Sequence, residues 1–307
     1  MQSKTKIIKA NSNRFNRPKN TSDRIFATVV LIISIATFII IAYPLWFVII
    51  ASISNSDLVN LGKVTFWPRD IRLYGYQQIA KDARIWSGYA NTIFYVVAGT
   101  ALNMVVTMPA AYALSRKTFK ARNKVMLYFV FTMFFSGGLV PTYMTVNALG
   151  LISTRTIFII FMALNTFNLI IARTFIENSI PDELYEAAVL DGCSHFYFFI
   201  KIVIPLSKAV ISVLILYYGV YHWNDYFNAL LFNSKSEFEP LQIVLRRILL
   251  LNEAFSSGTG VMGGYAQSSA DQVKYAVIIV STLPILCVYP FIQKYFEKGV
   301  MIGAVKG

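Results

Sequence analysis

The chain has 307 residues, of which 56% are hydrophobic and only 14% are charged, and its mean hydropathy is +0.56. This composition excludes an ordinary soluble globular domain and indicates an all-α integral membrane protein in a lipid bilayer. The formal charge of +13 does not indicate a nucleic-acid partner, because the basic residues are spread among loops and are not gathered with aromatic platforms. We interpret the charge as information about orientation in the membrane.

The N-terminal part of the chain predicts a basic tail followed by a first membrane span. Residues 1–24 are rich in Lys and Arg and show little apolar periodicity, which favours a cytoplasmic tail. The apolar run from Ile25 to about Ile53 is too long for a signal-peptide core, and no cleavage site follows it. We therefore expect a retained first span, with the polar segment from Asn55 to Gly88 outside the membrane.

Further apolar segments predict five more spans. The loop at 115–124 is dense in Lys and Arg, which marks the cytoplasmic side because such residues are enriched in cytoplasmic loops. Residues 25–296 are therefore expected to form a six-span domain with both termini in the cytoplasm. The five spans cover residues 91–114, 125–140, 156–176, 202–231 and 273–293, with a short external turn at 143–154, an external loop at about 233–271 and a cytoplasmic tail at 297–307.

A polar, amphipathic stretch at about 178–205 separates the predicted fourth and fifth spans. Ser179 and Asp182 have the spacing of a capping pair, which predicts the start of a short helix. Gly192 is expected to end that helix, because glycine adopts the left-handed conformation at low cost. A second helix is expected from near Ser194, and Pro205 allows a bend into the next span. The stretch therefore predicts a cytoplasmic helix-turn-helix.

The first of these helices is expected to present a surface to another protein. At 100° per residue, Leu184, Ala187, Ala188 and Asp191 share one face, which is apolar and has small side chains with an acid beside them. Two alanines allow close approach of a partner.

The spacing in this stretch carries a family resemblance. Glu186-Ala187-Ala188, then Gly192, then Ile202 to Pro205 follow the signature loop of ABC importer permeases, with Ile204 in place of the usual Leu. The chain resembles that family over nearly its whole length. The segments at 136–141 and 298–307 are similar to those of maltose-type carbohydrate permeases, and most similar to the permeases for complex oligosaccharides.

The resemblance implies a set of partners and a coupling role for the loop. It implies a bacterial plasma-membrane complex of this chain, a second related permease, two ATP-binding cassette subunits and an extracytoplasmic solute-binding protein that delivers an oligosaccharide. The chain itself lacks a phosphate-binding loop motif, so no cofactor is expected here, and ATP and Mg²⁺ are expected in the ATPase subunits. The residues implied in ATPase coupling are Glu186, Ala187, Ala188, Asp191 and Gly192.

Polar side chains within the predicted spans are candidates for a substrate pathway, because they are costly in a membrane unless they face protein, water or ligand. An arc of aromatic rings, amides and hydroxyl groups on the fifth span suits a sugar, which has an apolar ring face and an edge of hydroxyls. A polar helix–helix interface would use the same residue types. The candidates are Tyr217, Tyr218, Tyr221, Asn224, Asp225 and Asn228 on the fifth span, and Asn165 and Asn168 on the fourth.

Other functions compete with oligosaccharide import. An importer for an amino acid or a polyamine is one alternative, although a polyamine site is expected to have several inward carboxylates and only Asp225 qualifies. A membrane-embedded glycosyl or lipid transferase is another, and it would need clustered acids or metal ligands at one membrane face; a scaffold without transport is a third. His195 and His222 are expected to be structural, Asn103 is expected to make an interhelical hydrogen bond, and no metal site is predicted.

Overall fold

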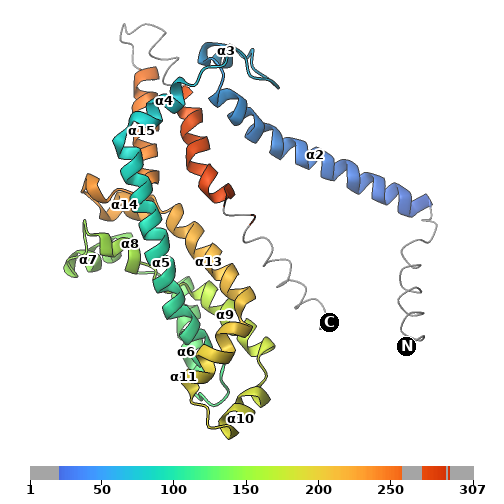
Figure 1. The fold of residues 1–307 in the computed structure, drawn as a ribbon, viewed down its shortest axis with the longest axis vertical. Helices are drawn as coiled ribbons and strands as arrows, with labels where there is room; N and C mark the ends of the chain where they lie inside the picture. The colour runs from blue at the N-terminus through green and yellow to red at the C-terminus, as the bar shows by residue number, and fades with distance from the viewer. Residues whose placement is uncertain (1–20, 258–271, 288–289, 291–307) are drawn as a thin grey trace. The chain divides into compact units, whose positions relative to one another are not determined.

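The computed structural model describes residues 21–257, 272–287 and 290, and every regular element in these ranges is helical (Figure 1). The chain divides into two compact units, residues 1–72 and 73–307. Residues 1–20 of the predicted tail at 1–24, the predicted tail at 297–307, and the glycine- and serine-rich part of the predicted external loop after residue 257 lie outside the described residues. Residues 21–24 of the predicted first tail are helical.

The first unit contains a long apolar helix. Helix α2 runs over Thr21–Ser52 and covers the predicted first span, and the short helix α3 (Ser56–Asn60) follows it. The Trp46 indole donates a hydrogen bond to the Phe66 carbonyl (2.9 Å) and ties the loop after α3 to the helix.

Helix α5 (Ala83–Ser115) is the scaffold of the second unit. It begins earlier than the predicted second span, because the Asp82 carboxylate accepts a hydrogen bond from the Arg84 backbone N–H and caps the helix. Helix α4 (Tyr74–Lys81) precedes it. Helices α9, α13 and α15 all pack along α5. Figure 1 shows α4 and α15 near one end of α5, and α10 and α11 near the other.

The predicted third span is shorter than expected and is followed by a second helix. Helix α6 covers Arg122–Phe134, and helix α7 covers Leu139–Ala148 at an angle of 114° to it. The turn between them includes Gly138 with φ +85°, a conformation that glycine adopts without strain. The expectation of an external turn at 143–154 was therefore wrong for its first half, which belongs to α7.

The predicted fourth span is not one helix. Helix α8 covers Arg155–Ile160 and α9 covers Thr166–Ser179, so the segment 161–165 is not helical. Met162 has φ +61°, and the Asn165 side chain caps α9 by accepting a hydrogen bond from the Asn168 N–H.

The predicted fifth span is also interrupted. After α11 (His195–Phe198) the chain makes a π-helical turn and a short helix to Leu206, then bends by 81° into α13 (Lys208–Trp223). The helical hydrogen bonding ends at Asn224, and α14 (Phe227–Phe232) is a separate helix. The expectation of one helix from 202 to 231 was wrong.

Residues 233–257 of the predicted external loop are described, and most of them form a helix. Helix α15 covers Leu241–Ser257 and buries Leu241, Val244 and Leu245. These side chains join a core cluster with residues of α5, and the Leu241 N–H donates a hydrogen bond to the Thr92 hydroxyl (2.8 Å). A further apolar helix covers Gln272–Cys287.

Within the described residues, α2 and α5 are each long and apolar enough to cross a membrane. The number rises to four if the α6–α7 pair and the bent pair ending in α13 each count as one span. The six spans inferred from hydropathy therefore stay a prediction.

Candidate functional site

Two places in the second unit hold the residues predicted to act, and the first is the helix-turn-helix between α9 and α13. Helix α10 covers Asp182–Leu190, and Gly192 has φ +79°, as predicted for the residue that ends it. The Cys193 N–H donates to the Ala188 carbonyl (2.9 Å), closing the end of the helix. The predicted cap at Ser179 was wrong, because α9 continues through Ser179 and Pro181 occupies the cap position without a side-chain hydrogen bond.

Ion pairs attach α10 to the basic loop after α5. The Asp182 carboxylate lies 2.8 Å from the Lys117 ammonium and 3.6 Å from the Arg116 guanidinium. The hydrogen bond from Lys117 lowers the pKa of the Asp182 carboxyl below its ordinary value, and the positive charges of Lys117 and Arg116 add to the effect. Arg122 and Arg173 contact Glu177 in the same region. The loop and the helix are therefore held together at one end of the unit.

The two helices of this segment also contact each other. The Tyr185 hydroxyl lies 2.8 Å from the His195 Nε2, and their rings stack with centroids 4.9 Å apart. Tyr185 also meets Phe198, which is fully buried, edge to face. This arrangement gives His195 the structural role that was expected of it.

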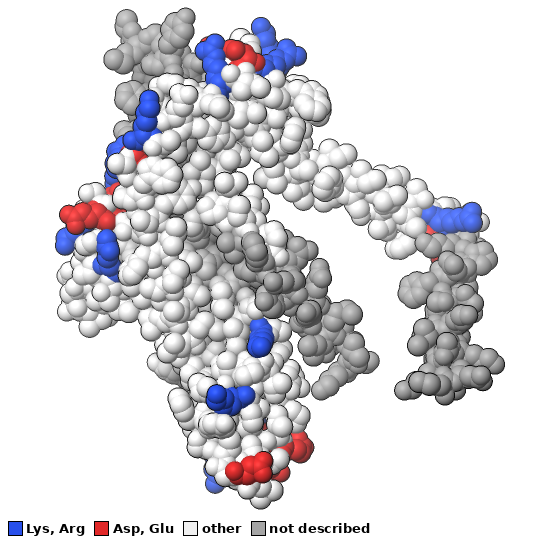
Figure 2. Space-filling view, in the orientation of Figure 1, with Lys and Arg blue, Asp and Glu red and all other residues white. Residues whose placement is uncertain are grey.

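The outer surface of this segment is both apolar and acidic. Leu190 and Phe196 are 89% and 76% exposed, and Figure 2 shows acidic side chains gathered at the end of the second unit where Figure 1 places α10. Of the five residues predicted to couple to an ATPase, Glu186, Ala187, Asp191 and Gly192 are exposed. Ala188 is buried in the chain's own core, so it fixes α10 in place and does not face outward.

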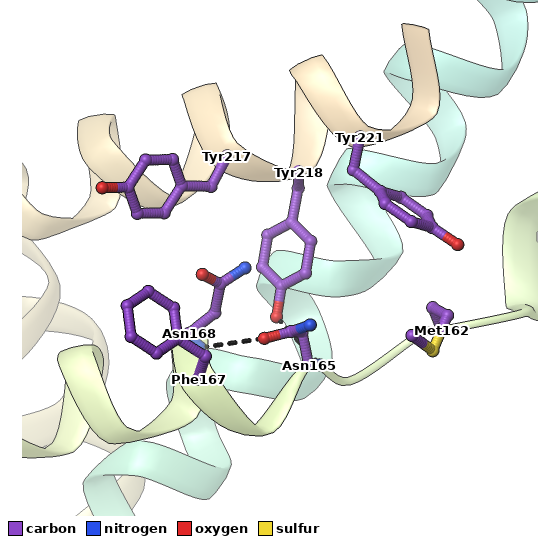
Figure 3. Close-up of a pocket in the computed structure, with 7 residues that line it drawn as sticks. All are labelled: Met162, Asn165, Phe167, Asn168, Tyr217, Tyr218 and Tyr221. Carbon is purple, nitrogen blue, oxygen red and sulfur yellow. Dashed lines mark hydrogen bonds between the residues drawn. The ribbon is translucent and has the colours of Figure 1, made fainter. Parts of the chain in front are cut away.

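The second place is a cavity of about 330 Å³ between α9 and α13 (Figure 3). It brings together five of the eight residues predicted for the substrate pathway, from two segments about 50 residues apart in the chain. Tyr218 is almost fully buried, whereas Tyr217 is 42% exposed. The lining residues are Met162, Asn165, Phe167, Asn168, Tyr217, Tyr218 and Tyr221.

The cavity wall is fixed by hydrogen bonds. The Asn165 amide oxygen accepts from the Asn168 N–H (3.1 Å), which Figure 3 marks with a dashed line. The Tyr218 hydroxyl accepts from the Asn165 N–H (3.3 Å) and lies 2.7 Å from the Thr107 hydroxyl on α5. All seven lining side chains are uncharged, so this surface offers hydroxyl, amide and aromatic groups to a ligand.

Asn224, Asp225 and Asn228 lie beyond the end of α13 and do not line this cavity. Their predicted alignment with Tyr217 assumed one continuous helix, and the interruption after Trp223 removes that assumption. Asn228 donates to the Asp225 carboxylate (2.8 Å) and to the Tyr221 hydroxyl (3.0 Å). Tyr221 therefore joins this second polar group to the cavity.

Two lining residues were not predicted. Met162 has an ordinary apolar side chain, and nothing in the sequence distinguishes it from its neighbours. Phe167 stands between the predicted residues Asn165 and Asn168. An aromatic ring next to two amides in the sequence could therefore have indicated it as a lining residue. The described residues contain no group of three or more His, Cys, Asp and Glu side chains placed to hold a metal ion.

Residues 7–302 match the model of the family described as "binding-protein-dependent transport system inner membrane component". The chain is 39% identical over 269 residues to the polygalacturonan/rhamnogalacturonan transport system permease protein YtcP of Bacillus subtilis (strain 168), covering 88% of this chain and 94% of that one. It is also 39% identical over 264 residues to the protein LplC of the same organism, covering 86% and 89%.

A solved structure is similar over almost the whole chain. It belongs to a bacterial ABC transporter involved in the import of the acidic polysaccharide alginate, and it matches with a TM-score of 0.82 and 32% identity, covering 92% of this chain and all of the other. The family match spans most of the sequence and is supported by relatives above 30% identity. The chain therefore belongs to the inner-membrane components of binding-protein-dependent transport systems, as a permease subunit of the ABC type.

Proposed function

We propose that this chain forms one half of the translocation pathway of an ATP-driven importer for oligosaccharides. An extracytoplasmic binding protein delivers the sugar, a second related permease completes the pathway, and two ATPase subunits supply the energy. ATP and Mg²⁺ are bound by those ATPase subunits and not by this chain.

The observation that carries the proposal is the uncharged tyrosine and asparagine cavity between α9 and α13. A tyrosine ring can cover the apolar face of a sugar ring, while amide and hydroxyl groups exchange hydrogen bonds with its hydroxyls. Permeases named for polygalacturonan and rhamnogalacturonan, and one from an alginate importer, are similar to this chain. An amino-acid or polyamine site has less support, because the lining offers no carboxylate to pair with the ammonium groups of those solutes.

The exposed surface of α10 and α11 supports an ATPase contact. Exposed apolar side chains next to acids are typical of protein interaction sites. Leu190 and Phe196 offer the apolar part, and Glu186 offers a partner for a basic group. Because α10 is attached to the end of α5 through Asp182, movement of an ATPase against α10 would reach the helices that line the cavity.

The six-span topology and a cytoplasmic position of both termini are part of this proposal. The contact of Asp182 with Arg116 and Lys117 puts the basic loop and α10 on the same side of the unit. The opposite end of α5 meets the segment after α14, where Asn91 donates to the Glu237 carbonyl (2.8 Å). In this arrangement the bent pairs count as single spans and residues 297–307 form the cytoplasmic tail.

The test is purification of the intact complex from the native membrane in mild detergent, with mass spectrometry of the bound subunits. ATPase activity is then measured with binding protein loaded with oligogalacturonides, alginate oligosaccharides or neutral oligosaccharides. Recovery of an ATPase and a second permease, with stimulation by one loaded binding protein, is the expected result. Recovery of this chain without an ATPase, under conditions that preserve known importers, would contradict the proposal.

A further inference from the structure

The non-helical segment 161–165 supplies Met162 and Asn165 to the cavity, so its position decides the shape of the site. A segment outside a helix leaves backbone carbonyls without intrahelical partners, and within a membrane protein these need partners elsewhere. Met162 also adopts φ +61°, which is unfavourable for a residue with a side chain. Contacts from other helices must therefore hold this conformation.

Asn103 on α5 provides such contacts. Its side chain is completely buried, and its Nδ2 donates to the Met162 carbonyl (2.8 Å) and the Ala163 carbonyl (2.9 Å). The two hydrogens of the amide are both used in this way. One side chain therefore pairs two consecutive carbonyls of the interruption.

His222 on α13 completes the arrangement. Its Nε2 lies 2.8 Å from the Asn103 Oδ1, and it is 3% exposed. Because the Asn103 amide oxygen can only accept, the His222 Nε2 must carry the hydrogen and donate it. The hydrogen bonds thus run in one direction, from His222 through Asn103 to the carbonyls of Met162 and Ala163.

Gly99, one turn before Asn103 on α5, leaves space for the His222 ring that donates to Asn103. A Cβ at this position would lie 2.4 Å from the Cε1 and Nε2 atoms of His222. A side chain at 99 would therefore displace the ring that orients Asn103. Neither Asn103 nor His222 lines the cavity.

We propose that Asn103 and His222 are positioning residues for the sugar-binding cavity, which they shape by holding the non-helical segment 161–165. This inference rests on the proposed oligosaccharide transport. Asn103 acts on the segment directly, and His222 acts by fixing the orientation of the Asn103 amide.

The main test uses the whole importer reconstituted in proteoliposomes with binding protein loaded with an oligogalacturonide or alginate oligosaccharide. We expect Asn103→Leu and His222→Leu each to lower the sugar transported per ATP hydrolysed by roughly tenfold, as the loss of a buried hydrogen bond implies. Complex yield and the stimulation of ATPase activity by loaded binding protein should stay within about twofold of wild type, because both residues are buried and neither lies on the α10 and α11 surface proposed to contact the ATPase.

Two further variants separate positioning from general packing. His222→Gln keeps a donor near the position of Nε2 and should recover most of the transport. Thr100→Val is the matched control, since the Thr100 hydroxyl is buried on α5 without a hydrogen-bond partner in the described part of the chain. It should leave transport per ATP unchanged. The double variant Asn103→Leu with His222→Leu should transport no less sugar per ATP than either single variant, because both residues act through the hydrogen bonds of Asn103.

A second measurement does not depend on the sugar. In a background with Cys193→Ser and Cys287→Ser, the rate at which a thiol reagent modifies Met162→Cys reports the position of the segment. Adding Asn103→Leu should change this rate several-fold, and adding Thr100→Val should not.

The two measurements distinguish the possible failures. If Asn103→Leu leaves both transport per ATP and the Met162→Cys rate unchanged, or lowers yield and ATPase activity in the same proportion as transport, the positioning role is refuted. If wild type transports none of the oligosaccharides while the Met162→Cys rate still depends on Asn103, the proposed substrate class fails and the structural role of Asn103 stands.

Discussion

Replacing Gly99 with alanine would put a methyl group where the His222 ring lies. The Cβ would be 2.4 Å from two ring atoms, a distance that no packed structure tolerates without movement. Overpacking costs about 1–3 kcal/mol, and separating His222 from the Asn103 acceptor costs about 1–3 kcal/mol more. Alanine restores about 1 kcal/mol through its better helix propensity. We therefore expect a net loss of stability of roughly 1–5 kcal/mol.

Gly219→Ala is the matched control on the facing helix α13. Its Cβ would meet Val96 at 3.9 Å and Thr100 at 4.0 Å, which are ordinary contacts. Both substitutions gain the same helix propensity, so the difference in stability between the two variants measures the cost of displacing His222, including its hydrogen bond to Asn103.

Thermal unfolding of the purified protein in detergent, followed by size-exclusion chromatography, checks this prediction. Gly99→Ala should lower the Tm by several degrees, at about 2–4 °C per kcal/mol for chains of similar size, and Gly219→Ala should not lower it. In combination with His222→Ala, Gly99→Ala should cost almost nothing further, because the obstructing ring is gone. Equal Tm values for Gly99→Ala and Gly219→Ala would show that the ring does not lie against Gly99.

Three other predictions concern the coupling segment and the cavity wall. Glu186→Lys should abolish the response of ATPase activity to loaded binding protein in the reconstituted importer; full coupling in this variant would disprove the role of the α10 surface. The pKa of Asp182 is lowered in the folded chain, so its stabilising pair with Lys117 is present above the ordinary carboxyl pKa of about 3.9 and is lost as the pH falls through the lower folded value. The protection factors of the α10 amides, which correct hydrogen exchange for its intrinsic pH dependence, should therefore fall below about pH 4 in wild type and be low already at neutral pH in Asp182→Asn. A loss of wild-type protection as the pH falls from 7 to 5 would exclude this pair as the attachment. Tyr218→Phe should leave the buried Thr107 hydroxyl without its partner and destabilise the protein by about 1–3 kcal/mol, measured as a lower Tm; an unchanged Tm would mean that water replaces the lost hydroxyl.

The helix-turn-helix was predictable because its signals are local. Gly192 ends α10 with a left-handed backbone, and Pro205 stands two residues before the bend at Ser207. A glycine or proline acts on its immediate neighbours whatever the rest of the chain does. The start of α10 was misplaced because Ser179 has the residue type of a cap, while the preceding helix continues through it.

Helix α15 was missed although its signal is in the sequence. Leu241, Val244, Leu245 and Ile248 have helical spacing, and in the structure the first three are buried in the cluster that includes α5. The glycine- and serine-rich segment that follows gave the whole stretch the composition of a loop. A shorter window ending before that segment would have separated the two parts.

Five of the cavity residues were predicted because they are polar side chains within apolar spans. The shape of the cavity depends on contacts between helices, which hydropathy does not report. The segments 156–176 and 202–231 are apolar enough to be interpreted as single spans despite the polar residues within them, because an interrupted helix in a membrane protein keeps apolar side chains on both sides of the interruption. Asn165 is a favourable cap residue directly before α9, and it is the one local sign of the first interruption. The side chain that satisfies that interruption is Asn103 on α5, which stands 59 and 60 residues before the two carbonyls that it pairs.

The two interruptions are connected by the same hydrogen bonds. Asn103 pairs the carbonyls of the first interruption, and its other partner, His222, stands two residues before Asn224, where α13 ends and the second interruption begins. Backbone that leaves the helical path inside a membrane protein is tolerated where other protein groups satisfy it or where it lines a cavity, and both conditions hold at 161–165. A shift of α13 along α5 would move His222 relative to Asn103 and change the support of the first interruption. Hydrogen bonds therefore tie together the elements that line the cavity, and under the proposed coupling a displacement of α10 at the end of the same helices would reach these elements together.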